Sequence, residues 1–155
     1  MKQLGFVIAF IAMSVFGIMG AKAQTVVDGV YTGTLSNIKM NSNSYDDATG
    51  VEFELIDNGN GTGTLMGSIG PIGKMPGTIE VNMTVTISEN GALSASANDP
   101  AGTLVLNTGG SMDISVSSFS GQVNENTIHF VLNTYAFKAF GAEVFPASVT
   151  FDGNK

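Results

Sequence analysis

A two-residue alternation of apolar and polar side chains recurs along this chain and limits what it can fold into. The clearest case is TIEVNMTVTIS, residues 78–88. Its apolar members are Ile79, Val81, Met83, Val85 and Ile87. Successive side chains of a β-strand point to opposite faces of a sheet, so the pattern predicts a strand with one buried face and one wet face. After residue 23 no segment shows a convincing 3.6-residue apolar period, which indicates an all-β protein.

The same pattern, with weaker examples included, predicts about eight strands. They are GVYTGTL, VEFEL, TGTLMGSI, TIEVNMTVTIS, ALSASA, SMDISVSSFSGQV, TIHFVLNTYAF and VFPASVTF. Clusters of Gly, Asn, Asp and Pro separate them. The cluster at residues 57–61 fails as a calcium loop because Gly59 and Gly61 stand where oxygen side chains are needed. It predicts a hairpin turn whose glycines supply positive φ. The segment 69–77, with two prolines, is expected to cover one end of the sheet.

A meander of eight strands has to hide its edges, and closing into an up-and-down barrel does so completely. We therefore expect a single eight-stranded antiparallel barrel, with a two-sheet β-sandwich as the alternative. A barrel in the outer membrane shares the alternation. It is disfavoured because the chain has no tryptophan and too few aromatic residues for two interfacial girdles.

The first 23 residues have the order of a signal peptide. Lys2 precedes an apolar run from Leu4 to Gly20, and Ala21-Lys22-Ala23 provides an A-x-A cleavage site. We expect cleavage after Ala23 and one barrel domain over residues 24–155, located in the periplasm or secreted and not spanning a membrane. The chain has no cysteine, which excludes a lipid-modified cysteine and a disulfide framework.

The charge balance of residues 24–155 limits the classes of molecule that this part of the chain is expected to bind. This part keeps four lysines, no arginine and all thirteen acidic residues, for a net charge of −9. Nucleic acid is not expected as a partner because phosphate contacts need a basic face. The absence of arginine also disfavours sites that grip a carboxylate or phosphate through a guanidinium.

Four segments resemble the calycin-like, lipocalin-like barrel proteins exported by gut Bacteroidetes. They are GVYTGTL, GKMPGTIEVNMTVTI, SFSGQVNENTIHFVL and VFPASVTFDG, within residues 28–153. The calycin group places a Gly-x-aromatic motif on its first strand, which Gly29 and Tyr31 match with tyrosine in place of the more usual tryptophan. The arginine that lipocalins commonly pack against this aromatic ring is absent. The resemblance implies a closed barrel with no assigned enzymatic activity.

The chemistry of the side chains points away from catalysis and metal binding. The single histidine, His129, lies in a predicted strand, and no nucleophile-elbow motif accompanies it. One histidine without cysteine excludes ordinary zinc sites. Asp46, Asp47, Glu52 and Glu54 form the densest acidic group, which the alternation interprets as a wet strand face beside an acidic loop. Lys74 is expected in a solvated turn. We expect no enzyme, no cofactor and no metal.

The interior of the expected barrel is the remaining candidate site. Its ligand-binding candidates are the large apolar residues Phe53, Met83, Phe130 and Phe151. The small Ala95 and Ala97 would leave space opposite them, although the same mixture also suits a filled barrel. The first functional hypothesis is a lumen that binds a small apolar or lipid-like molecule. The alternative is a protein-interaction module of the cell envelope, an assembly subunit or a protease-inhibitor-like protein, whose loops carry the function.

Overall fold

A computed structural model describes residues 26–155, so the expected signal peptide and its cleavage site lie outside the described residues. Twelve strands follow one another along this range. They are β1 Gly29–Met40, β2 Asn43–Ser44, β3 Ala48–Asp57, β4 Thr62–Ile69, β5 Gly77–Ile87, β6 Ala92–Ala95, β7 Pro100–Leu106, β8 Ser111–Val123, β9 Thr127–Tyr135, β10 Phe137–Ala139, β11 Ala142–Val144 and β12 Ala147–Asn154. No helix long and apolar enough to cross a bilayer occurs in this part of the chain.

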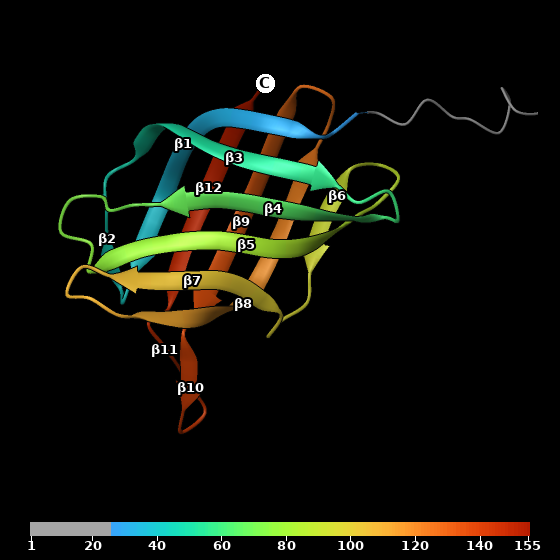
Figure 1. Cartoon of the computed structure of the whole chain (residues 1–155). Coiled ribbons are helices and arrows are strands. Elements are labelled where there is room, and N and C mark those ends of the chain that lie inside the picture. Colours follow the sequence, from blue (N-terminus) through green and yellow to red (C-terminus); the bar gives the residue numbers. More distant parts are fainter. Residues whose placement is uncertain (1–25) are drawn as a thin grey trace, which may run out of the picture.

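The strands form a closed antiparallel barrel (Figure 1). Around the barrel the order is β1, β3, β4, β5, then β6 and β7 in one shared position, then β8, β9 and β12, which pairs back onto β1. The eight positions confirm the predicted eight-stranded barrel, and the sandwich alternative is not what the chain forms. The short β2 adds to the edge of β1, and β10 pairs only with β11 in a separate hairpin.

The shared position of β6 and β7 differs from the prediction. β5 pairs with β7 from Gly77 to Val81 and with β6 at Thr86 and Ile87. The segment between β6 and β7, residues 96–99, leaves the sheet, and Asn98 adopts a positive φ of 74°. The strand predicted over ALSASA therefore ends at Ala95. Ala97 is exposed in the turn and not inside the barrel, so its expected place in the lumen is wrong.

The seam between β1 and β12 closes the barrel. It pairs residues from Thr32↔Asn154 to Met40↔Ala147. At Gly33 the two backbones approach so closely that a Cβ atom would lie 1.9 Å from the carbonyl oxygen of Asp152. Only glycine fits at this point of the seam, because every other residue would place a carbon atom inside the neighbouring strand.

The two ends of the barrel are built differently. One, which we call the turn end, carries the short connections 58–61, 88–91 and 124–126. The predicted hairpin is found here: Gly59 and Gly61 both have φ of 80°, and the Asp57 carboxylate accepts a hydrogen bond from the Gly59 N–H at 2.8 Å. The other, the hairpin end, carries the segments 41–47, 70–76, 107–110 and 136–146. Met75, 2% exposed, folds inward from the 70–76 segment and covers this end as expected.

Alternation decides which side chains fill the barrel. On β5, Ile79, Val81, Met83 and Val85 are all at most 4% exposed, while the intervening Glu80, Asn82 and Thr84 are exposed. Among the described residues no buried side-chain nitrogen or oxygen lacks a hydrogen-bond partner. The barrel therefore has one continuous apolar core, as expected of a closed sheet with one dry face.

Candidate functional site

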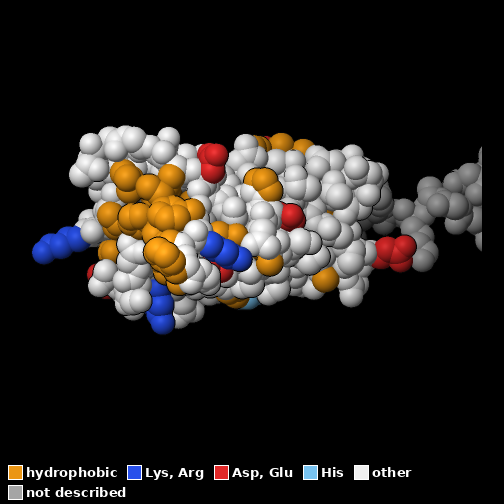
Figure 2. All heavy atoms as spheres, turned by 90° about the horizontal axis from the view of Figure 1, so that it is seen from below, with side chains coloured by type: hydrophobic (Ala, Val, Ile, Leu, Met, Phe, Trp, Pro, Cys, Tyr) orange, Lys and Arg blue, Asp and Glu red, His pale blue; other side chains and the backbone are white. Residues whose placement is uncertain are grey.

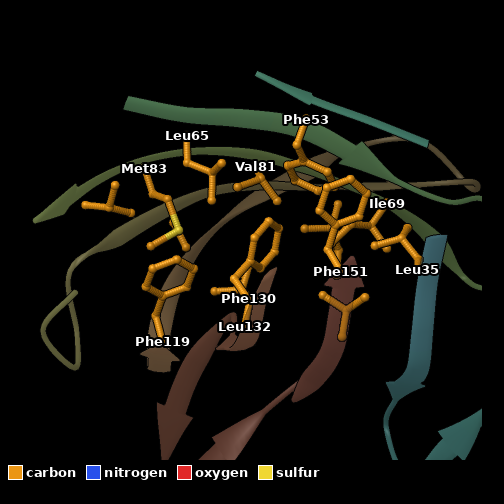
Figure 3. Packing of buried hydrophobic residues seen from close by; sticks show 14 of the residues in the cluster. Leu35, Phe53, Leu65, Ile69, Val81, Met83, Phe119, Phe130, Leu132 and Phe151 are labelled. Atoms are coloured by element: carbon orange, nitrogen blue, oxygen red, sulfur yellow. The ribbon is translucent and has the colours of Figure 1, made fainter. Parts of the chain in front are cut away.

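The four lumen candidates all lie inside the barrel. Phe53 on β3, Phe130 on β9 and Phe151 on β12 are fully buried, and Met83 on β5 is 2% exposed. Figure 3 shows the three rings against one another near the middle of the core, with Met83 pointing toward Phe119 of β8. Strands far apart in sequence thus bring the four predicted residues into one cluster.

The phenylalanine rings pack directly on each other. Ring centroids lie 5.1 Å apart for Phe53 and Phe130, 4.8 Å for Phe53 and Phe151, and 5.3 Å for Phe130 and Phe151. The first pair meets edge to face at 79°, and these separations are those at which aromatic pairs attract. No ligand-sized space lies between these rings, because each is in contact with the other two.

Glycines on neighbouring strands make room for these rings. Gly67 is the cross-strand partner of Phe53, and a Cβ atom on it would lie 2.4 Å from the Phe53 ring. Gly121 is the cross-strand partner of Phe130, and a Cβ atom on it would lie 2.5 Å from the His129 carbonyl oxygen and 2.8 Å from the Phe130 Cβ. The large residues and the glycines are therefore complementary parts of one packed layer.

The side chains leave little empty space in the barrel. An apolar cavity of about 10 Å³ lies toward the hairpin end, next to Ile69, Met75, Leu132 and Val149. None of Phe53, Met83, Phe130 and Phe151 lines it. A cavity of this size is at the lower limit for one water molecule, whereas a small-molecule site needs roughly 300–1,000 Å³.

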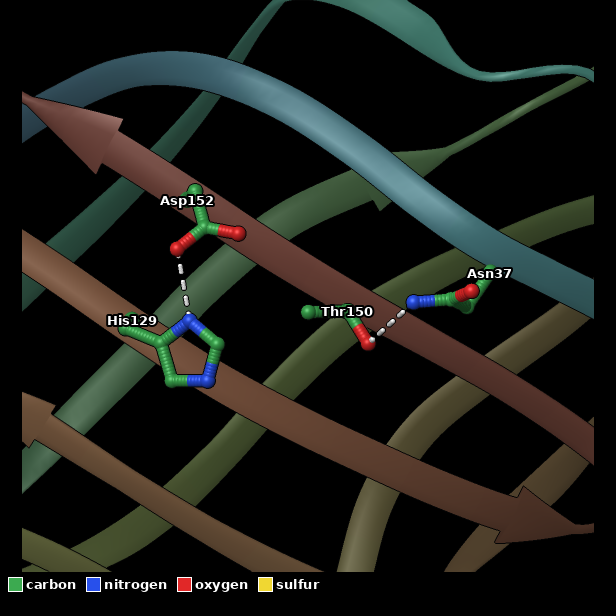
Figure 4. A network of polar contacts seen from close by, with 4 residues as sticks. All are labelled: Asn37, His129, Thr150 and Asp152. Atoms are coloured by element: carbon green, nitrogen blue, oxygen red, sulfur yellow. Dashed lines mark hydrogen bonds and ion pairs between the residues drawn. The ribbon is translucent and has the colours of Figure 1, made fainter.

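The single histidine lies on the outside of the barrel. His129 Nδ1 is 2.6 Å from a carboxylate oxygen of Asp152 across the β9–β12 pair, and the two side chains are 51% and 63% exposed (Figure 4). A second pair on this face joins Asn37 and Thr150 at 3.4 Å. Within residues 26–155 no serine or threonine hydroxyl hydrogen-bonds to His129, so the arrangement lacks the nucleophile of a catalytic relay. The strand histidine with a polar neighbour is confirmed.

Metal binding finds no support in the described part of the chain, where no three His, Cys, Asp or Glu side chains come together. Glu52 and Glu54 lie on the exposed face of β3, and Asp46 and Asp47 lie in the exposed loop before it, as the alternation predicted. Lys74 is an exposed loop residue, also as predicted.

The surface near the turn end has a shallow depression of about 310 Å³. Its lining includes Gln122, Asn124, His129 and Asp152. The 124–126 turn beside it is held by its own side chain: the Asn124 amide oxygen accepts from the N–H groups of Asn126 and Thr127 at 3.0 and 2.9 Å. Asn90 and Asn60 hold the other two turns in the same manner. These turns are pre-formed and polar, which suits recognition of a polar surface.

Sequence reasoning missed the β10–β11 hairpin. Its strands pair in the register Phe137↔Val144, Lys138↔Glu143 and Ala139↔Ala142. The loop consists of Phe140 and Gly141 with φ of 51° and 79°, a two-residue turn with both central residues at positive φ. The residues between TIHFVLNTY and ASVTF do alternate, but the loop has phenylalanine where asparagine, aspartate or glycine is usual, so no turn signal marks it.

Tyr31 of the Gly-x-aromatic motif lies at the turn end of the core. It is fully buried, and its hydroxyl donates a hydrogen bond to the Val27 carbonyl at 2.5 Å. The Lys155 ammonium lies 5.1 Å from the centre of its ring. A lysine from the last strand's end therefore supplies a cation–π contact on this aromatic ring in a chain that has no arginine.

The fold and this geometry define a closed, solid eight-stranded β-barrel with polar turns at one end and a projecting hairpin at the other. Comparison of the chain with protein-family models, with curated proteins and with solved structures found no match.

Proposed function

We propose that this protein is a non-enzymatic interaction module of the cell envelope, in which the filled barrel is a scaffold and the outer surface contacts a protein partner. The observation that carries the proposal is the packed interior, with a cavity of about 10 Å³. A small apolar ligand in the lumen, the other function expected from the sequence, would require Phe53, Phe130 or Phe151 to leave the core. Recognition through the surface requires no such movement.

The turn end is the surface that best suits a protein contact. Its three turns are fixed by side-chain hydrogen bonds, so little conformational entropy remains to be lost on binding. The depression beside His129 and Asp152 adjoins one of them, the 124–126 turn, through Asn124. A rigid rim beside a shallow hollow is an arrangement typical of surfaces that recognise another protein.

The charge of the turn end indicates what kind of partner it fits. Asp28, Asp57, Glu89 and Glu125 lie in or next to its connections, and Lys155 is the lysine there. The surplus of carboxylates favours a partner with a basic patch, attracted over a distance that depends on salt.

Export supplies the setting of this proposal. The signal-peptide pattern of residues 1–23 supports this, because it predicts a processed chain in the periplasm or outside the cell. Within residues 26–155 no hydroxyl hydrogen-bonds to His129, which supports a role without catalysis.

Native mass spectrometry of the processed chain, purified from the cells that make it, separates the two functions. We expect the bare mass of the polypeptide, alone or with a second protein. A stoichiometric small molecule that survives gentle desolvation would contradict the proposal and favour the lumen hypothesis. A parallel control with the chain refolded from denaturant shows which mass belongs to the polypeptide itself.

Charge reversal then tests the surface. The double variant Glu89→Lys/Glu125→Lys is expected to weaken the protein complex and to flatten its salt dependence, because both carboxylates are exposed at the turn end. The matched control, Asp46→Lys/Asp47→Lys, makes the same charge change in an exposed loop at the hairpin end. An equal loss of binding in both variants would place the contact elsewhere.

A further inference from the structure

Two hairpin turns at the turn end contain asparagine followed by glycine. This dipeptide occurs three times in the chain, at Asn58-Gly59, Asn60-Gly61 and Asn90-Gly91. All three lie in the connections 58–61 and 88–91. Asparagine before glycine is prone to intramolecular deamidation, because glycine has no Cβ atom to keep its nitrogen away from the asparagine side chain.

The reaction needs a free glycine nitrogen and an activated asparagine carbonyl. Hydroxide from the solvent removes the proton of the glycine N–H, and the nitrogen attacks Cγ of the asparagine side chain. Negative charge develops on the side-chain oxygen Oδ1, so hydrogen-bond donors to Oδ1 stabilise this step. A glycine N–H that already donates to another group cannot lose its proton until that hydrogen bond opens. The hydrogen bonds of the folded chain therefore determine which of the three pairs reacts.

Asn60-Gly61 meets both requirements. The Asn60 Oδ1 accepts two hydrogen bonds, from the Thr62 N–H at 3.1 Å and from the Thr62 hydroxyl at 2.6 Å. Within residues 26–155 the Gly61 N–H donates no hydrogen bond, while the Gly61 carbonyl accepts from the Ile87 N–H at 2.8 Å. Asn60 and Gly61 are both exposed, so hydroxide and water reach them. Figure 1 places this turn at the right-hand tip of the barrel, and Figure 2 shows that end as mostly backbone and uncharged polar side chains.

Asn90-Gly91 has an equivalent carbonyl but a blocked nitrogen. The Asn90 Oδ1 accepts from the Ala92 N–H at 3.2 Å and from the Ser88 hydroxyl. The Gly91 N–H, however, donates to the Ser88 carbonyl at 2.9 Å. The Gly91 carbonyl accepts from the Val123 N–H at 2.8 Å, which holds this turn against β8. Comparison of this pair with Asn60-Gly61 isolates the effect of the glycine nitrogen, because the donors to Oδ1 are of the same kind.

Asn58-Gly59 lacks both features. The Gly59 N–H donates to the Asp57 carboxylate at 2.8 Å, and this negative charge also opposes removal of the proton. The Asn58 side chain uses its NH₂ group, which donates to the hydroxyls of Thr62 and Thr64 at 3.2 and 3.5 Å. Among the described residues no donor bonds its Oδ1, so the carbonyl of this asparagine is not activated.

We propose that Asn60 is a site of spontaneous deamidation in the folded protein, with Gly61 as the nucleophile and Thr62 as the donor to Oδ1, and that Asn58 and Asn90 are protected. The deprotonated Gly61 nitrogen forms a bond to the Asn60 Cγ. The side-chain nitrogen leaves as ammonia, taking a proton from water and regenerating hydroxide. The product is a cyclic succinimide. Water then opens this ring at the side-chain carbonyl to give aspartate, or at the backbone carbonyl to give isoaspartate.

Either product changes the surface of the turn end. Each adds a carboxylate to an end that already carries Asp28, Asp57, Glu89 and Glu125. Isoaspartate also lengthens the main chain by one carbon atom inside a turn that the Asn58 N–H closes on the Thr62 carbonyl at 2.9 Å. The modification is irreversible without a repair enzyme. Its chemistry does not depend on the protein contact proposed above.

Peptide mapping of the aged protein tests the order of reactivity. The processed chain is incubated in mildly alkaline buffer, digested with trypsin and analysed by mass spectrometry, with electron-transfer fragmentation to distinguish aspartate from isoaspartate. Cleavage after Lys39 and Lys74 yields one peptide that contains both Asn58 and Asn60. We expect conversion at Asn60 to be about fivefold to tenfold faster than at Asn90, the factor that one hydrogen bond of ordinary net strength gives. Equal rates at Asn60 and Asn90, or a faster reaction at Asn58 or Asn90, would overturn the proposal.

The same incubation in concentrated urea separates the effect of the fold from that of the local sequence. Unfolding removes the hydrogen bonds of all three pairs, so their rates are expected to become similar. If Asn60 remained the fastest by the same factor in urea, the local sequence and not the folded turn would cause the difference. An Asn60 that reacts in urea but stays intact in the folded protein would equally contradict the proposal.

Two threonine variants test the donor to Oδ1. Thr62→Val removes the hydroxyl that bonds Asn60 and is expected to slow its conversion by about threefold to tenfold. Thr64→Val, the matched control, removes only a hydroxyl that accepts from Asn58 and should leave the Asn60 rate unchanged. The rate at Asn90 in the same sample shows whether the barrel stays folded, because its protection depends on the fold. An unchanged or faster reaction at Asn60 in Thr62→Val, with Asn90 still protected, would show that Thr62 does not assist.

Discussion

The barrel interior and the β10–β11 hairpin use the same residue type in opposite ways. Phe53, Phe130 and Phe151 meet in the core and are fully buried, whereas Phe137 and Phe140 are 49% and 110% exposed on the hairpin. Both regions are antiparallel strands with alternating side chains. Alternation therefore determines which residues share a face of a strand. Whether that face is buried depends on the surrounding structure.

In the barrel the deciding factor is closure. Once β12 pairs with β1, one face of every strand is enclosed and the apolar set has to occupy it. In the hairpin no closure exists, and its orientation is set by the bonds of Lys138 to Asn98 and of Ser117 to Glu143. These bonds tie the exposed Lys138 and Glu143 to the barrel, and Phe137 on the opposite face of the hairpin is 49% exposed.

Replacing a phenylalanine by alanine is expected to give the largest difference in stability between the barrel interior and the hairpin. Phe130→Ala is expected to lower the free energy of unfolding by about 3–5 kcal/mol, because it removes a fully buried ring and leaves a cavity. Phe140→Ala is expected to change it by less than about 0.5 kcal/mol, because the ring makes no core contact. Urea unfolding followed by far-ultraviolet circular dichroism measures both. Similar losses in the two variants would contradict the assignment of one ring to the core and the other to solvent.

Replacing a glycine by alanine is expected to give the next largest difference in stability between the barrel and the hairpin. Gly33→Ala is expected to cost about 1–3 kcal/mol, since its Cβ would collide with the Asp152 carbonyl at the closing seam. Gly141→Ala has open space around it, and its cost, about 1–2 kcal/mol, comes from φ of 79° and falls on the hairpin alone. Thermal unfolding should therefore shift for Gly33→Ala and remain in place for Gly141→Ala. A shift of the same size in Gly141→Ala would mean that the hairpin and the barrel unfold together.

A buried hydroxyl at the turn end gives a smaller effect with a distinct pH dependence. Tyr31→Phe is expected to cost about 1 kcal/mol, because the Val27 carbonyl loses its donor. Burial, and then the nearby Asp28 carboxylate, raise the pKa of Tyr31 above its ordinary value of 10.0. The unfolded chain therefore loses this proton first as the pH rises.

The consequence for stability has a definite sign. The contribution of the protonated Tyr31 is fully present below pH 10, the ordinary pKa, and is lost as the pH rises through the higher pKa of the folded protein. Urea midpoints at pH 8 and above pH 10 should fall more for the unchanged protein than for Tyr31→Phe. The same decline in both proteins would show that other groups cause the alkaline loss.

Much of the fold followed from the sequence because alternation and turn residues are local signals. Phe53, Phe130 and Phe151 were expected on inward faces and are found there. The interruption between β6 and β7 was not predicted, because the turn at Asn98 and Asp99 is held by backbone hydrogen bonds to Val116 of β8, a long-range contact. The alternation along one strand does not show where that strand stops pairing with its neighbours in the sheet.

The residues of the candidate site could be predicted from the sequence, but the way they pack could not. Sequence placed Phe53, Met83, Phe130 and Phe151 on apolar faces, but whether they line a cavity or fill it depends on ring contacts between separate strands. Gly67 and Gly121 were the signals that could have indicated a filled layer, since a glycine opposite a large ring leaves room for that ring. The position of the β10–β11 hairpin could not be predicted, because it depends on bonds to Asn98 and Ser117, which lie far away in the sequence.

The smallest expected effect concerns the positive φ of Phe140. Phe140→Asn tests whether this backbone conformation destabilises the hairpin. Phe140→Asn should leave the global free energy of unfolding within about 0.5 kcal/mol, since the ring is fully exposed. It should slow hydrogen exchange of the Ala136 N–H, which bonds the Val144 carbonyl at 2.8 Å, because asparagine tolerates a positive φ better than phenylalanine. Phe137→Asn, at a strand position, is the control and should not slow it. Faster exchange in Phe140→Asn would mean that the ring stabilises the hairpin.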